Sequence, residues 1–396
     1  MANIKQVKQD IVYVGGDDRR LALFENTYPL PKGVSYNSYL IVDDKTALMD
    51  AVDASITSMF LDNLKTALNG RSLDYVIVQH MEPDHSATLA CLMEEYPNAT
   101  IVCNAKTETM IHQFFGDKLT FSPLLVKEGD TLPLGKHVLQ FLMAPMVHWP
   151  EVMMTYEQTE KILFSADAFG SFGALDGALF ADEVNFKEDF LSEARRYYAN
   201  IVGKYGAPVQ TVLKKTATFP IDMICPLHGF VWRQDLDFLL DKYQHWSTYQ
   251  PEERAVVVAY ASMYGHTAKA AEKVAALLVE RGMPVSIYDL SKTGRDEVLG
   301  EMFRASCVVL AAATHDGSIF EPMAYLLHEM QERNLQGRKV ALIENGSWAP
   351  VAAKQMKIAL DEMKDMQVVE PIVSIKSNLM PAQEDELQKV VEALVS

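Results

Sequence analysis

The chain has 396 residues, of which 49 % are hydrophobic and 22 % charged, a composition typical of two or three well-packed globular domains. Its net charge of −17 argues against nucleic acid and anionic membrane as partners. No apolar run reaches the roughly 18 residues of a membrane span, and no apolar segment follows the basic residues near the N-terminus, so neither a membrane helix nor a signal peptide is expected. The chain has four scattered cysteines that form no CxxC pair, Cys91, Cys103, Cys225 and Cys307. Scattered cysteines favour a protein of the reducing cytoplasm.

The first part of the chain, 1–250, alternates short apolar runs with turns and a few helices. In chain order the patterns predict a β-hairpin over 35–53, a buried strand over 73–80, a helix over 86–97, and strands over 100–105, 136–145 and 161–169. This mixture predicts two sheets flanked by helices. A proline and several charged residues near 246–254 then precede a new apolar strand, which places a domain boundary at 250/251.

The second part, 251–396, alternates strictly between strands and helices. The expected strands begin near 254, 283, 307 and 338, and the expected helices cover about 265–282, 321–334 and 349–363. The strands are continuously apolar, which is typical of strands buried on both faces. This part is therefore predicted to be an α/β domain with a doubly wound parallel sheet.

The stretch "VIVQHMEPDHSATL" (76–89) holds four potential metal ligands at the end of an apolar strand. His80, Glu82 and Asp84 are spaced so that they share one side of an extended segment, and Pro83 favours that conformation at Glu82. Asp84 and His85 are expected to lead into a helix that begins near Ser86. Ligands that change side within two residues suit two metal ions rather than one.

Further donors follow later strands: His148, Asp167 and His228. A single histidine at a strand end usually only packs or hydrogen-bonds, so the prediction depends on the combination. Four imidazoles and three carboxylates would leave one positive charge on two ferrous ions, and a bridging hydroxide would neutralise it. Mixed carboxylate and imidazole donors suit iron or manganese, and zinc remains open on ligand type alone.

A second group of loops predicts a flavin site. The loop after the first strand of the second part opens a helix and offers hydroxyl and backbone N–H groups to a phosphate, without the GK[ST] of a Walker loop or a GxGxxG motif. Two further loops follow strand ends, where ligands bind in open parallel sheets. The candidate residues are Ser262, Met263, Tyr264, Gly265, His266, Thr267, Thr314, His315, Asp316, Gly317, Asn345, Gly346, Ser347 and Trp348.

The HxExDH pattern of 80–85 resembles the HxHxDH motif of the metallo-β-lactamase superfamily, with Glu82 in place of the middle histidine. The three later loops resemble those of flavodoxins, with Tyr264 where a threonine is usual. The two together, in this order, resemble the flavodiiron proteins (A-type flavoproteins) over essentially the whole chain. The resemblance implies a metallo-β-lactamase-like αββα sandwich followed by a flavodoxin-like domain, and a reductase of oxygen or nitric oxide from an anaerobe or facultative anaerobe.

Carried over by position, the resemblance implies two iron ions and FMN. His80, Glu82 and His148 would hold one iron, Asp84, His85 and His228 the other, and Asp167 would bridge them. His85 is the position at which relatives differ. Tyr197 or Tyr198 would place a phenol near the irons as a proton donor, although plain helix packing is the favoured explanation for tyrosines there.

The resemblance also implies an external electron donor, a rubredoxin-like protein or reduced F420, and a head-to-tail homodimer or dimer of dimers in the cytoplasm. Two other functions remain open on the residues. One is a dinuclear zinc hydrolase with a fused flavodoxin-like domain, against which Glu82 and the flavin loops argue. The other is an electron carrier that uses only the flavin, against which the seven metal donors argue.

Overall fold

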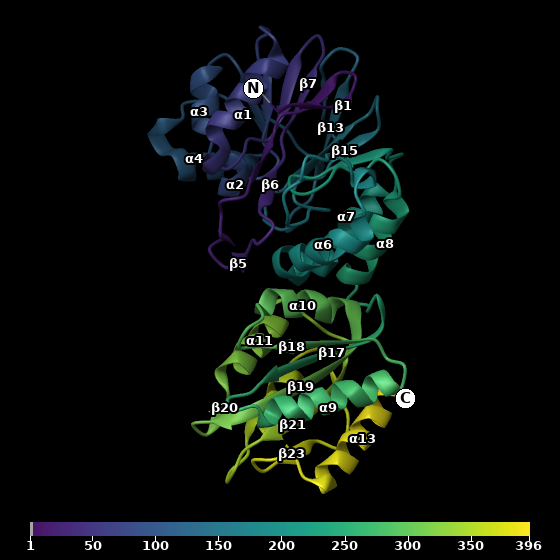
Figure 1. Cartoon of the computed structure of the whole chain (residues 1–396). Coiled ribbons are helices and arrows are strands. Elements are labelled where there is room, and N and C mark those ends of the chain that lie inside the picture. Colours follow the sequence, from purple (N-terminus) through teal and green to yellow (C-terminus); the bar gives the residue numbers. More distant parts are fainter. Residues whose placement is uncertain (1–2) are drawn as a thin grey trace. The chain divides into compact units, whose positions relative to one another are not determined.

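A computed structural model describes residues 3–396 and divides the chain into two compact units (Figure 1). The first unit runs to Ala194 and includes Ala207–Asp241. The second consists of Arg195–Gly206 and Lys242–Ser396. The predicted division at 250/251 treats the domains as consecutive, whereas the short helical segment 195–206 groups with the second unit. The consecutive division stays a prediction.

Two β-sheets form the centre of the first unit. The larger has the spatial order β1 (Lys5–Lys8), β2 (Ile11–Tyr13), β7 (Tyr39–Val42), β8 (Thr46–Met49), β9 (Tyr75–Ile77), β10 (Thr100–Cys103) and β11 (Leu124–Leu125). The smaller has the order β12 (Thr131–Pro133), β13 (Val138–Met143), β14 (Met153–Glu157), β15 (Ile162–Phe164) and β16 (Met223–Cys225). The predicted hairpin is β7–β8, paired antiparallel from Val42 and Thr46 outward.

Helices flank these sheets, which confirms the predicted αββα sandwich. In Figure 1, α1 (Thr57–Leu68), α3 (Leu89–Glu95) and α4 (Ala105–Phe115) lie to the left of the strands, and α7 (Gly206–Thr216) lies to the right. Short strands β3 (Gly16–Asp18) and β6 (Val34–Tyr36) pair with each other, as do β4 (Leu23–Phe24) and β5 (Tyr28–Pro29). Helices α2 (Pro83–Ser86) and α5 (Phe186–Asp189) also belong to this unit, whereas α6 (Leu191–Tyr197) and α8 (Leu236–Ser247) run across the division between the two units.

The second unit is a doubly wound parallel sheet, as predicted. Its order is β18 (Val285–Asp289), β17 (Glu253–Ala261), β19 (Ala305–His315) and β21 (Lys339–Asn345), and β21 also pairs with β22 (Gln367–Val368) and β23 (Val373–Ile375). A short antiparallel strand, β20 (Ser318–Ile319), folds back on the end of β19. The strand order reverses between β17 and β19, so their carboxyl ends form the crevice where such sheets bind ligands.

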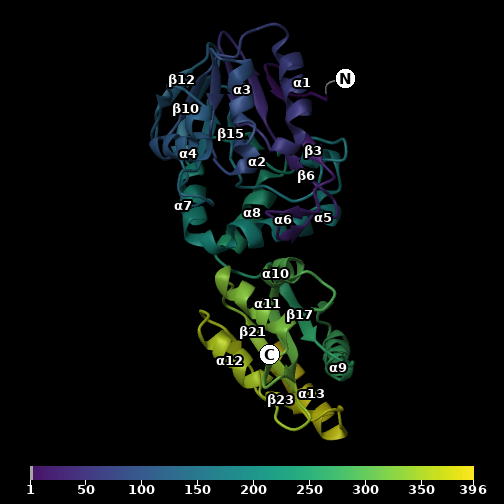
Figure 2. The ribbon, with the colours of Figure 1, turned by 90° about the vertical axis from the view of Figure 1, so that its left-hand side faces the viewer.

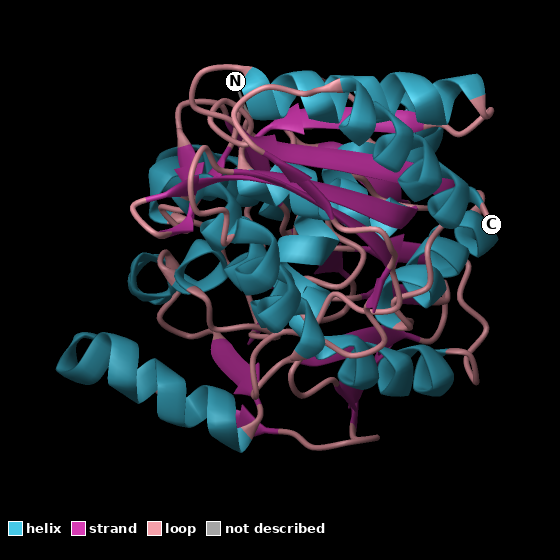
Figure 3. Cartoon of the chain, turned by 90° about the horizontal axis from the view of Figure 1, so that it is seen from below, coloured by secondary structure: helices cyan, strands magenta, loops and turns pink. Residues whose placement is uncertain are grey.

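Helices cover both faces of this sheet, as the views in Figures 2 and 3 show. Helices α9 (His266–Glu280) and α13 (Pro381–Val395) contact each other on one face. Helix α11 (Glu321–Glu332) contacts both α10 (Arg295–Arg304) and α12 (Ala352–Asp361) on the other. The sequence pattern does not predict α10 or α13.

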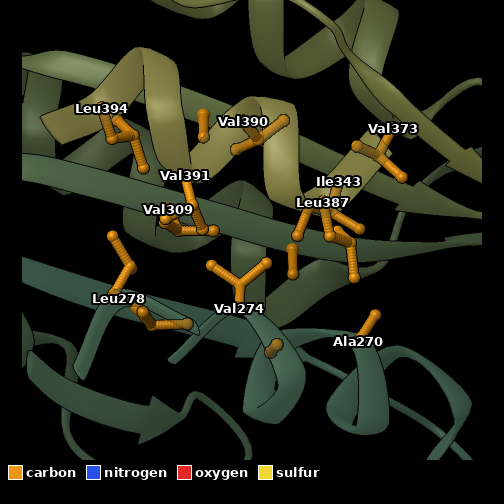
Figure 4. Close-up of a cluster of buried hydrophobic side chains, with 14 of the residues drawn as sticks. Ala270, Val274, Leu278, Val309, Ile343, Val373, Leu387, Val390, Val391 and Leu394 are labelled. Atoms are coloured by element: carbon orange, nitrogen blue, oxygen red, sulfur yellow. The ribbon is translucent and has the colours of Figure 1, made fainter. Parts of the chain in front are cut away.

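The core between α9, α13 and the sheet is mainly aliphatic (Figure 4), with Met283 and Cys307 as its buried sulfur-containing members. Val274 and Leu278 of α9 and Val390 and Leu394 of α13 point toward Val309 of β19, and all five are at most 2 % exposed. Burying a side chain of this size stabilises the fold by roughly 1.5–3 kcal/mol. This packing leaves the carboxyl-terminal loops of the sheet free to bind a ligand. No helix in the described part of the chain is long and apolar enough to cross a membrane.

Candidate metal centre and flavin pocket

The HxExDH segment lies where β9 leaves the larger sheet. Glu82 has extended backbone angles, φ −56° and ψ 139°, as predicted. The predicted start of the following helix was wrong, because helix α2 begins at Pro83, directly after Glu82, rather than near Ser86. Proline suits the first position of a helix, since its fixed φ is helical and it lacks an N–H that would remain unsatisfied there. Asp84 and His85 are therefore presented by a helical turn.

The later donors follow strands of the smaller sheet. His148 lies in the loop between β13 and β14, Asp167 follows β15, and His228 follows β16. Strands β15 and β16 are parallel neighbours, so the loops after them emerge at the same edge. The fold thus brings these donors together with the segment that follows β9.

The seven predicted metal donors form two groups. Within each group the donor atoms lie within 4.8 Å of one another. The groups are His80, Glu82, His148 and Asp167, and Asp84, His85 and His228. All seven residues are at most 8 % exposed. His85 lies in the second group and Asp167 in the first, so the grouping has the same members as the implied assignment except for the bridging place of Asp167.

Asp167 connects the two groups through its two oxygens. Oδ2 lies 3.2 Å from Nε2 of His80 and 3.1 Å from Nε2 of His148. Oδ1 lies 3.1 Å from Nε2 of His85 and 3.7 Å from Nε2 of His228. One carboxylate oxygen thus faces each group, which is the geometry that a ligand shared by two metal ions requires.

The electrostatics of the site favour bound cations. Burial opposes protonation of His148, but the carboxylates of Asp167 and Glu82 outweigh it and raise the pKa of His148 to about 9. Burial also opposes ionisation of Asp167, and the neighbouring imidazoles His85 and His80 nevertheless hold the pKa of Asp167 well below its usual value. Buried carboxylates that stabilise positive charge on imidazoles would stabilise a metal ion in the same place.

Two buried carboxylates that the sequence analysis missed support the HxExDH segment. Glu151 accepts hydrogen bonds from Nδ1 of His80 at 2.8 Å and from the N–H of Met81 at 2.9 Å. Asp50 accepts from the N–H of Gln79 at 2.7 Å, and burial raises the pKa of Asp50 to about 6. The signal for Glu151 was its place three residues after His148, in the same loop.

Glu25 is a third missed carboxylate. Glu25 is exposed as a residue, but desolvation of its carboxyl group and the neighbouring Glu82 raise its pKa to about 8. Its backbone has a positive φ of 49°, which is uncommon outside glycine. The loop between β4 and β5 thus brings an additional carboxyl group to the first donor group.

Aromatic rings surround the imidazoles. The ring of Trp149 meets His80 edge to face with 5.3 Å between centroids. Phe24 and Tyr36 pack edge-on against His228. Tyr197 is fully buried on α6 (Leu191–Tyr197), in the segment that groups with the second unit, and is in neither donor group. Its role as a proton donor stays a prediction.

The second unit has a cavity of about 530 Å³ at the carboxyl ends of β17, β19 and β21. This volume lies in the range of cofactor sites, roughly 300–1,000 Å³. All the predicted flavin residues except Gly265 line it, and the sequence analysis missed Ala313, Ala349 and Ser377. The three loops chosen from the sequence therefore meet in one pocket.

The loop of residues 262–265 forms the end of this pocket suited to a phosphate. Gly265 is the N-cap of α9 and has φ 89°, a conformation that favours glycine. Its N–H donates to Oγ of Ser262 at 3.2 Å. No side chain caps this helix start within the described residues, so N–H groups of the first turn can bind a phosphate.

The other two loops are held together by their own side chains. Oγ1 of Thr314 accepts from the N–H of Val351 at 3.0 Å, at the start of α12. Asn345 exchanges two hydrogen bonds with the backbone of Ser377, at 3.0 and 3.1 Å. Tyr264 and Trp348 are both 91 % exposed at the pocket, as rings that stack on a flat cofactor would be before it binds. The residues that line the pocket thus fit flavin mononucleotide (FMN).

Comparison with protein families agrees with both halves of this description. The model of the "ODP family beta lactamase" matches residues 34–229, and that of flavodoxin matches residues 258–376. An "Anaerobic nitric oxide reductase flavorubredoxin" of Vibrio vulnificus is 32% identical over 382 residues, 95% of this chain and 76% of the relative. A protein of the same name from Aliivibrio fischeri is 34% identical over 352 residues, 86% of this chain and 69% of the relative.

Solved structures share the whole fold. The flavodiiron protein from Giardia intestinalis superposes with a TM-score of 0.94 at 25% identity, covering 100% of this chain and 97% of that one. The rubredoxin oxygen:oxidoreductase of Desulfovibrio gigas superposes with a TM-score of 0.91 at 26% identity, covering 99% and 98%. Fold and site together define a two-domain oxidoreductase that pairs a metallo-β-lactamase-like domain with a flavodoxin domain. The chain belongs to the flavodiiron protein family, whose cofactors are FMN and a pair of irons.

Proposed function

We propose that the chain reduces nitric oxide to nitrous oxide, or oxygen to water, at a non-haem diiron site, with electrons that pass through FMN. The observation that carries this proposal is Asp167, whose two oxygens face two separate donor groups. We place nitric oxide first, because the relatives named nitric oxide reductases are 32–34% identical to the chain, against 26% for the oxygen:oxidoreductase.

The seven donors, His80, Glu82, Asp84, His85, His148, Asp167 and His228, would hold the irons. When bound, the irons would act as Lewis acids toward the gas and the flavin would supply electrons. His80 and His228 are fully buried, whereas Glu82, Asp84 and His148 are 7–8 % exposed, so the gas would approach from the side of these three residues. The buried imidazoles keep water from the opposite side.

An external electron donor belongs to the same proposal. The family takes electrons from rubredoxin-like donors, and we propose a rubredoxin-like protein or reduced F420 for this chain. We also propose a head-to-tail homodimer, or a dimer of such dimers, in the cytoplasm. Analytical ultracentrifugation tests the assembly, and an active monomer would contradict it.

An anaerobic titration of the fully reduced, iron-loaded protein tests the reaction. Each gas is added in known amounts while flavin absorbance is followed and products are identified. Repeated nitrous oxide formation is expected with nitric oxide, and water formation by four-electron oxidation with oxygen. A colourless protein that holds zinc and leaves both gases unchanged would instead establish a zinc hydrolase. If the Asp167→Ala variant still reduced the gases, the alternative function, an electron carrier that uses only the flavin, would be favoured instead.

A further inference from the structure

The two donor groups differ in what lies behind their histidines. In the first group Nδ1 of His80 lies 2.8 Å from Oε1 of Glu151. In the second group Nδ1 of His228 donates to the backbone carbonyl of Ser35, also at 2.8 Å. Nδ1 of His85 is buried and has no hydrogen-bond partner within residues 3–396. The Glu151 carboxylate therefore accepts from a histidine of the first group, whereas in the second group a neutral carbonyl accepts from His228 and no acceptor meets Nδ1 of His85.

The Glu151 carboxylate determines which nitrogen of His80 carries the proton. Because a carboxylate accepts, the hydrogen resides on Nδ1, and the lone pair on Nε2 is free for a metal. That Nε2 lies 3.2 Å from both Glu82 and Asp167, the other donors of the group.

Glu151 also connects two ligand loops. Its carboxylate accepts from His80 and Met81 in the loop after β9, and its own backbone lies in the loop that carries His148. Nδ2 of Asn104 donates to the carbonyl of Glu151 at 2.6 Å and anchors that loop to β10. Glu151 is 1 % exposed, so water does not compete for these contacts. Two ligands of the same metal position are thus held by one residue.

We propose that Glu151 is a positioning residue that makes the His80–Glu82–His148 position the tighter of the two metal positions. A carboxylate behind a histidine ligand increases electron donation from the metal-binding nitrogen and prevents rotation of the ring. It also adds a fourth negative charge beside the three ligand carboxylates. The inference rests on the proposed diiron function, since it concerns how unequally the two irons are held.

The test compares Glu151→Gln with wild-type holoenzyme in iron release to a chelator. The amide oxygen of glutamine can still accept both hydrogen bonds, so the variant removes mainly the charge. Wild type is expected to release its two irons in two phases. In Glu151→Gln the slower iron should be held about 10- to 100-fold more weakly, the usual effect of removing such a partner, while the other is unchanged. Equal retention in both proteins would overturn the inference.

Glu157→Gln is the matched control. Glu157 is fully buried on β14 and its Oε1 lies 3.1 Å from Nδ1 of His137, in neither donor group. It reproduces the loss of a buried histidine–glutamate pair without touching the metal ligands. Iron release from this variant should match wild type. Weakening of the same iron by both variants would show a general loss of stability and would contradict the role of Glu151.

A measurement on the unaltered chain covers the case in which Glu151→Gln does not fold. Metal-free protein is loaded with one equivalent of iron and crystallised, and anomalous scattering locates the ion. Density concentrated at the His80 position is expected, and equal density at both positions overturns the inference. A wild-type protein that binds no iron at all would contradict the proposed function instead, so the two failures are distinguishable.

Discussion

The metal centre and the flavin pocket are built in opposite ways. The metal donors are at most 8 % exposed, and several have charged or polar partners in other loops. The flavin pocket is formed by loops at strand ends, with Tyr264 and Trp348 91 % exposed. A buried set of charges tolerates little change because each loss leaves another charge unpaired. An open pocket depends more on backbone shape and on rings that complete their contacts when the cofactor binds.

The largest effect is expected from Asp167→Ala. Because Asp167 faces both donor groups, its loss should remove the shared ligand of both irons, and gas reduction should fall by at least about a thousandfold, as when roughly 4 kcal/mol of barrier lowering is lost. Iron content and nitrous oxide formation measure the loss. FMN content should stay at the wild-type level, and its parallel loss would show that the two sites are not independent.

Gly265→Val tests the backbone of the flavin pocket. A β-branched residue at φ 89° costs roughly 1–3 kcal/mol, so FMN should bind about five- to a hundredfold more weakly, as a fluorescence titration would show. Gly282→Val is the control, since Gly282 has φ 74°, also has open space around it, and follows the opposite end of α9 from the loop of residues 262–265. If both variants weaken FMN equally, the effect is general strain.

Trp348→Ala tests the exposed ring. A stacking contact contributes about 0.5–1.5 kcal/mol, so FMN affinity should fall by roughly tenfold or less. The melting temperature of the flavin-free protein should not change, because the ring is 91 % exposed and supports no core. Trp348→Phe should restore most of the affinity. A lower melting temperature without FMN would show that the ring packs on the protein itself.

The smallest effect on the metal centre and the flavin pocket is expected from Glu157→Gln. This variant tests the buried pair of His137 and Glu157, which lies outside both sites. The Glu157 carboxylate, 3.1 Å from Nδ1 of His137, raises the pKa of His137, and His137 in turn helps to lower the pKa of Glu157 against the effect of burial. The pair therefore stabilises the fold fully between the unfolded values of 4.5 and 6.5. Its contribution is lost as pH rises through the raised pKa of His137 and as pH falls through the lowered pKa of Glu157.

Denaturant unfolding of wild type and Glu157→Gln across this range measures that contribution. The difference in unfolding free energy should be largest near pH 6, about 1–3 kcal/mol, and should shrink above it. Subtracting the variant cancels titration at the metal centre, which both proteins share. A difference that grows with pH would contradict the assigned charges.

Much of the fold follows from local patterns. The alternation of apolar strands and helices after residue 253 predicts the parallel sheet, because strands buried on both faces need no polar side. The pattern does not predict α10 and α13. Helix α13 has charged residues at several positions, and its helical stripe, Leu387, Val390, Val391 and Leu394, becomes a core only where α9 and the sheet meet it. Helix α2 begins three residues earlier than predicted because Pro83 starts a helix instead of extending the strand.

The sequence by itself determined the kinds of donor atoms and the order of the two domains. Ligand types, the HxExDH spacing and the loops at strand ends are local features, and each is visible within a few residues. Only the tertiary structure decided that one oxygen of Asp167 faces each donor group, that Glu151 supports His80, and that Asn345 holds Ser377. These contacts join residues 32 to 87 positions apart, and they exist because separate strands end at a common edge. The periodicity of a single segment therefore cannot predict these contacts between loops that are distant in the sequence.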